Sequence, residues 1–72
     1  MFYTTKQVGM MFGLTAQAVI YWEENGILKC SFRRGNRRMY SKVDIIDYAN
    51  TLSKRRVIDI DEKFKFIYEE QI

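Results

Sequence analysis

The sequence predicts a mainly α-helical domain of three to four helices that carries a small β-hairpin wing. Three observations predict this class: apolar residues recur at helical spacing, Thr and Ser stand where helices would begin, and a basic run joins two apolar segments. A chain of 72 residues has room for one core. We expect the main domain over residues 1–52, followed by a basic linker and a short amphipathic helix over residues 53–72.

The first helix is predicted over residues 5–12. Thr4 precedes it and Gln7 stands three residues later, which is the pattern of a capping box. Gly13 follows, and glycine readily adopts the left-handed conformation that ends a helix. Residues at i, i+3 and i+4 form the inward face of this helix: Val8, Met11 and Phe12.

The second helix is predicted to begin after Thr15 and to extend to about Asn25, where Asn25-Gly26 is a stop signal. Because so short a turn separates it from the first helix, the pair forms a helix-turn-helix. Its inward stripe is formed by Ala18, Val19 and Trp22. Gln17, Ile20 and Tyr21 are left on the outward face.

The outward face of the second helix is the predicted DNA-reading surface. Gln17 can pair with adenine through two hydrogen bonds, and the hydroxyl of Tyr21 can donate to a phosphate. The alternatives are a solvated Gln17 and a Tyr21 packed on the helix flank.

The basic run Arg33-Arg34-Gly35-Asn36-Arg37-Arg38 is predicted to form the wing. Segments 27–32 and 39–40 read as the two strands that flank it, joined by a loop longer than a two-residue turn, which would project. Guanidinium groups match phosphate oxygens and guanine edges. A third helix then begins after Ser41, with Asp44 in its first turn and an apolar stripe up to Leu52.

Charge is divided sharply along the chain. Residues 33–56 hold eight basic and two acidic residues, a net charge of +6, whereas residues 57–72 carry −3. This outline is typical of a polyanion-binding surface, although a basic solvated face is the alternative. In the tail, acidic residues from Asp59 onward predict the start of a fourth helix with Phe64, Ile67 and Tyr68 on one face. That face either covers the core or forms the seam of a homodimer or cooperative oligomer.

Several classes of function find no support in the composition. With one cysteine and no histidine, the common zinc ligand sets cannot form and a Cys-His nucleophile is impossible. No phosphate-binding glycine loop accompanies Gly35, so we expect neither an enzyme, nor a cofactor, nor a metal. The longest nearly apolar run, residues 8–14, is too short to span a bilayer. A cytoplasmic, nucleoid-associated protein of bacterial or phage origin is expected.

Residues 3–48 resemble the MerR-type winged helix-turn-helix. The resemblance rests on four segments, which are Tyr3 to Val8, Phe12 to Thr15, Val19 with Trp22-Glu23 and Gly26-Ile27-Leu28, and Arg38 to Ser41. It implies that the second helix enters the major groove and that the wing grips the backbone.

By position, the resemblance implies that Arg38 is the wing arginine, Tyr40 the tyrosine that follows it, and Tyr21 the aromatic residue that touches the backbone. Ile20 departs from the pattern, because the family places an arginine there; it could touch a thymine methyl group or another protein. We expect no effector domain after the third helix, and no small-molecule effector is evident.

The sequence therefore predicts a protein that binds double-stranded DNA at specific sequences, most simply a small transcription regulator. Phage excisionases and small terminase subunits share the architecture, so recombination and DNA packaging are alternative roles, and a protein-interaction module acting through the tail is an alternative of another class. The predicted contact residues are Thr15, Gln17, Ile20, Tyr21, Arg33, Arg34, Asn36, Arg37, Arg38 and Tyr40.

Overall fold

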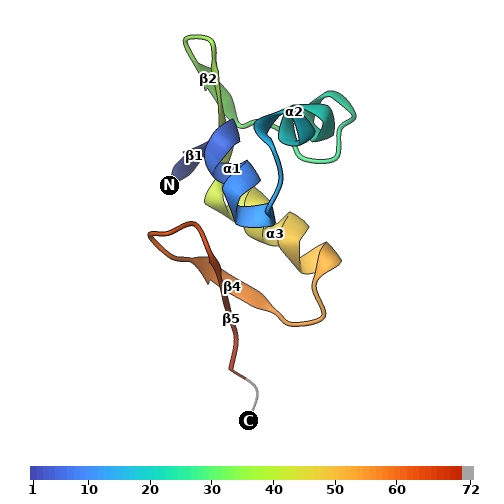
Figure 1. The fold of residues 1–72 in the computed structure, drawn as a ribbon, viewed down its shortest axis with the longest axis vertical. Coiled ribbons are helices and arrows are strands. Elements are labelled where there is room, and N and C mark those ends of the chain that lie inside the picture. Colours follow the sequence, from blue (N-terminus) through green and yellow to red (C-terminus); the bar gives the residue numbers. More distant parts are fainter. Residues whose placement is uncertain (71–72) are drawn as a thin grey trace.

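Three helices form the centre of the protein in a computed structural model that describes residues 1–70 (Figure 1). The elements follow in the order β1 (Phe2–Thr4), α1 (Thr5–Phe12), α2 (Ala16–Glu24), β2 (Phe32–Arg34), β3 (Arg37–Ser41), α3 (Lys42–Leu52), β4 (Val57–Ile60) and β5 (Phe66–Tyr68). One antiparallel sheet has the strand order β1-β3-β2, and β4 pairs with β5 in a second. The helices of the described residues are all too short or too polar to cross a membrane.

Each helix begins at the residue that the sequence predicts. Thr4 and Gln7 form a reciprocal capping box, with N···O distances of 3.2 Å to the Thr4 hydroxyl and 2.9 Å to the Gln7 amide oxygen. The Thr15 hydroxyl accepts from the Ala18 amide at the start of α2, and Ser41 caps α3. These caps satisfy amide groups that the first turn leaves without partners, which is why local sequence predicts them.

The turn between α1 and α2 depends on Gly9. Its carbonyl oxygen accepts a hydrogen bond of 2.8 Å from the amide of Leu14. A β-carbon at Gly9 would lie 2.7 Å from the carbonyl oxygen of Leu14, closer than such contacts allow. Glycine at this position therefore lets the turn close tightly on α1, and Gly13 ends the helix with φ of 69°.

The core lies where α1, α2 and α3 meet β1 and β3. Its buried cluster consists of Tyr3, Val8, Met11, Val19, Leu28, Tyr40, Ile45 and Ile60. Trp22, predicted to be a core residue, is half-buried and packs against this cluster. Its ring stacks edge-on with Phe12 and with Tyr48, at centroid distances of 5.1 Å in both cases.

The predicted fourth helix is wrong, because the tail forms the hairpin β4–β5. Phe64, Ile67 and Tyr68 have helical spacing, but Phe64 lies in the left-handed region with φ of 61° and belongs to the turn. The side chain of Asp61 accepts from the amides of Lys63 and Lys65, which stabilises that turn. β-Branched residues at positions 57, 58 and 60 favour a strand. Tertiary contacts then determine that the tail forms a hairpin and not a helix.

Two side chains of α3 attach the β4–β5 hairpin to this helix through polar contacts. The side-chain amide of Asn50 donates to the carbonyl of Val57 at 3.1 Å and accepts from the amide of Val57 at 2.7 Å. Lys42 at the start of α3 forms an ion pair with Asp59 of β4. The hairpin thereby lies against α3, at the end of the molecule opposite β2 (Figure 1).

Candidate nucleic-acid interface

Four arginines lie on the paired strands β2 and β3, which with their turn we call the arginine hairpin (residues 32–41). Arg33 is opposite Arg38, and Arg34 is opposite Arg37. The strands are joined by a two-residue turn, Gly35-Asn36, in which Gly35 has φ of 63° as the first residue of a type II′ turn does. The prediction of a longer loop is therefore wrong.

The first predicted strand is also misplaced. Residues 27–31 are not part of a strand, and β2 begins at Phe32. Leu28 is buried beneath this connection and contributes to the core, so its apolar character serves packing rather than strand pairing. As a result, the arginines lie on strands with fixed positions instead of on a projecting loop.

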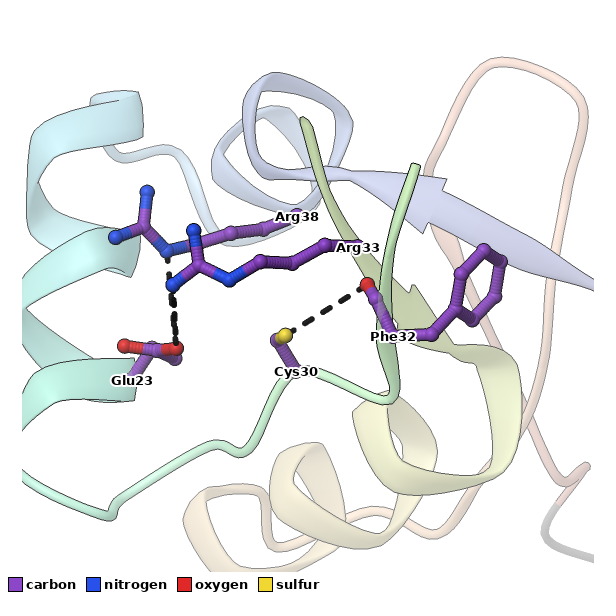
Figure 2. Close-up of polar contacts among 5 residues, drawn as sticks. All are labelled: Glu23, Cys30, Phe32, Arg33 and Arg38. Atoms are coloured by element: carbon purple, nitrogen blue, oxygen red, sulfur yellow. Dashed lines mark hydrogen bonds and ion pairs between the residues drawn. The ribbon is translucent and has the colours of Figure 1, made fainter. Parts of the chain in front are cut away.

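The arginine hairpin is joined to α2 through one carboxylate. Oε1 of Glu23 lies 3.7 Å from Nη2 of Arg33 and 3.7 Å from Nε of Arg38. Figure 2 shows the two arginine side chains extending side by side from the hairpin toward Glu23 on α2. Like charges directly opposite each other destabilise a strand pair, and Glu23 offsets that repulsion between Arg33 and Arg38.

Glu23 is a residue of the candidate interface that the sequence-based prediction did not include. It stands four residues after the buried Val19 and so lies on the same side of α2. A carboxylate on the inward side of a helix requires a cationic partner, because its desolvation is otherwise costly. The four-residue spacing between Val19 and Glu23 could therefore have predicted that a basic residue from a distant part of the sequence packs against this side of α2.

Tyr40 lies inside the domain, which corrects the prediction that it touches DNA. Its side chain is fully buried, and its hydroxyl makes no hydrogen bond of ordinary geometry among the described residues, although the Thr5 side chain is near enough to act on it. Burial raises the pKa of the Tyr40 phenol, an effect that the Thr5 side chain opposes and the Glu23 carboxylate reinforces. Tyr40 therefore packs β3 of the arginine hairpin against the core, close to the Glu23 ion pairs. Its side chain is not accessible to a ligand.

The predicted contact residues of α2 have different environments. Gln17 and Tyr21 are exposed, as expected of an outward face, and Ile20 between them is half-buried. Thr15 is exposed, although its oxygen is engaged in the cap of α2. On the arginine hairpin, Arg33, Arg34, Asn36 and Arg37 are exposed and Arg38 is half-buried.

Two helices joined by a tight turn, followed by a basic hairpin, define a helix-turn-helix class of protein. Consistent with this geometry, residues 3–47 match the family described as MerR HTH family regulatory protein. The chain belongs to the MerR HTH family, and at this level it is a DNA-binding regulator. A comparison with curated proteins and one with solved structures each returned no match.

Proposed function

We propose that this chain binds double-stranded DNA at specific sequences and acts as a small transcription regulator, with α2 in the major groove and the arginine hairpin as a wing on the flanking backbone. The observation that carries the proposal is the shared contact of Arg33 and Arg38 with Glu23. Because Glu23 belongs to α2, the helix that reads bases and the hairpin that binds phosphates have a set relative position.

Base recognition is assigned to the exposed face of α2. Gln17 reaches an adenine edge, where an amide side chain makes two hydrogen bonds, and Ile20 contacts a thymine methyl group. Tyr21 and the Thr15 hydroxyl at the start of the helix donate to phosphate oxygens. These groups set register and sequence preference.

Backbone binding is assigned to the tip of the arginine hairpin. Arg34 and Arg37 are exposed and belong to none of the ion pairs within residues 1–70. Arg33 and Arg38 exchange Glu23 for phosphate in part, and Asn36 lies at the turn, where it can enter the adjacent minor groove. This contribution is independent of sequence and depends on salt.

Useful specificity requires more than one copy, since a single module covers few base pairs. We assign self-association to the β4–β5 hairpin within residues 57–72, of which the last two lie outside the described residues. Ile58 of β4 and Ile67 of β5 are exposed. The β4–β5 hairpin lies at the end of the molecule opposite the arginine hairpin (Figure 1). Two copies can therefore pair while both wings remain free.

Selection of bound duplexes from a random DNA pool tests the proposed function. We expect an enriched motif, with inverted half-sites for a symmetric dimer or direct repeats for side-by-side copies. Binding to that motif should weaken in Gln17→Ala, whereas Lys63→Ala, at the far hairpin, should bind as the parent does. Absence of both enrichment and DNA retention at low salt would disprove the proposal.

A further inference from the structure

A groove separates the tip of the arginine hairpin from the first turns of α1 and α2. Its volume is about 640 Å³. Its lining from the hairpin includes Arg34, Arg37 and Arg38, and its lining from the helices includes Thr5 and Lys6 of α1 and Ala16 of α2. The groove therefore brings together two parts of the chain that are distant in sequence.

Positive charge is concentrated in this groove, and among its cations only Arg38 has a carboxylate partner within the described residues. Four of the residues that line it are cationic and none is acidic. Lys6, Arg34 and Arg37 take part in no ion pair within residues 1–70. Arg34 and Arg37 lie opposite each other on paired strands, yet no carboxylate offsets their repulsion as Glu23 does for the other pair. An anion from outside the chain would supply the missing compensation.

The backbone adds to the same field. Thr5 and Lys6 are the first two residues of α1, so their amides have no acceptor four residues earlier within the helix. Ala16 occupies the equivalent position in α2. The partial positive charge at the start of each helix therefore adds to the positive potential that the arginine and lysine side chains create in the groove.

We propose that this groove holds the phosphate backbone of one DNA strand, with Lys6 and the first amides of α1 on one side of the strand and Arg34 and Arg37 on the other. Lys6 is then a phosphate-binding residue, which the contact set based on α2 and the wing does not include. The strand is held between α1 and the hairpin instead of lying against the hairpin alone. This inference rests on the proposed function.

Measurement of DNA affinity at several salt concentrations tests the role of Lys6. Lys6→Ala should lower the slope of log K against log salt concentration by about 0.9, the value for one lost phosphate contact. The loss of affinity should be equal for the preferred duplex and a random one, because a phosphate contact carries no sequence information. Lys6→Arg should restore the slope of the parent protein.

Lys63→Ala is the matched control, since it removes the same charge from an exposed position in the β4–β5 turn. It should leave the slope unchanged. If Lys6→Ala keeps the slope of the parent while Arg37→Ala lowers it, the groove inference is wrong and the proposed function stands. If the parent protein binds no DNA, the proposed function itself fails and the inference falls with it.

Discussion

Nε of Arg38 lies 3.7 Å from the carboxylate of Glu23, and that Nε has no hydrogen-bond partner among the described residues. The distance corresponds to an ion pair without a hydrogen bond. Arg38 is half-buried at this place, so its charge is only partly satisfied by Glu23. The two 3.7 Å contacts of Glu23 therefore connect the arginine hairpin to α2 without fully satisfying the charges of Arg33 and Arg38.

Replacement of Glu23 by Gln should strengthen binding to random DNA and reduce discrimination. Loss of the carboxylate frees Arg33 and Arg38 for phosphate, and a partly exposed ion pair of this kind corresponds to about a two- to fivefold change in affinity. The preferred duplex should gain less, because the hairpin is no longer positioned against α2. Fluorescence anisotropy with both duplexes measures the two effects.

Glu24→Gln is the matched control for this variant. Glu24 is exposed, adjacent in sequence, and absent from the ion pairs of residues 1–70. Glu24→Gln should raise the affinity for both duplexes by the same small factor. Equal behaviour of the two variants would mean that Glu23 acts only through net charge and does not position the hairpin.

Tyr40→Phe should leave DNA binding unchanged, because the side chain is fully buried. At pH 7 we expect a free energy of unfolding that is equal to that of the parent or higher by up to about 1 kcal/mol, since an unsatisfied hydroxyl is removed. Urea unfolding measures this quantity. A loss of more than about 1 kcal/mol would indicate that the hydroxyl is hydrogen-bonded in solution.

The pH dependence of stability provides a second measurement on Tyr40. Its pKa is raised above the ordinary value of 10.0, so the folded chain keeps the proton where the unfolded chain releases it. This contribution to stability is complete below pH 10 and is lost as the pH rises through the folded pKa. The fall in unfolding free energy above pH 10 should be shallower in Tyr40→Phe. Tyr21→Phe, at an exposed position, should follow the parent.

Asn50→Ala should lower the free energy of unfolding by about 1–3 kcal/mol, the cost of leaving buried backbone groups unpaired. Asn50 bonds both the amide and the carbonyl of Val57, which is buried. Thr51→Ala, at an exposed position of the same helix, should change the stability by less than about 0.5 kcal/mol. Similar effects of the two substitutions would show that the Asn50 amide does not hold the hairpin.

The local sequence correctly predicts where each helix starts. It does not predict the elements whose structure depends on contacts between segments distant in sequence. Thr4, Thr15 and Ser41 bond amides three residues away, so the signal is contained in a few residues. β1 has three residues and pairs with β3, more than thirty positions later, which leaves no periodicity to detect. Apolar spacing in the tail predicts a helix, because that spacing contains no information about the hydrogen bonds between Asn50 and Val57.

In the candidate interface, too, some positions follow from local sequence and others depend on contacts between distant segments. Exposure of Gln17 and Tyr21 follows from the helical period of α2, so their positions were predictable. The position of Tyr40 in the core was not, because alternation in a strand does not tell which side will be covered. Similarly, Lys6 is an isolated lysine in sequence, and only the folded chain brings it to the groove beside Arg34.

Ile58→Lys combined with Ile67→Lys should convert self-associated protein to monomer. Both side chains are exposed on β4–β5, so the substitutions add charge to the proposed contact without entering the core. Deletion of the hairpin would be a poorer test, because it would remove Val57 and Ile60, which are buried. Sedimentation velocity over a range of protein concentrations, without DNA, measures the change, and circular dichroism checks that the variant is folded.

Met10→Lys combined with Val43→Lys is the control for this last variant, since it places the same charges at exposed apolar positions of α1 and α3. It should sediment as the parent does. A parent protein that remains monomeric at all concentrations would remove the hairpin from any role in self-association. In that case β4–β5 serves only its own domain, because Val57 and Ile60 are buried and Phe64 and Phe66 pack against the core, which adds apolar area that a core of this size requires.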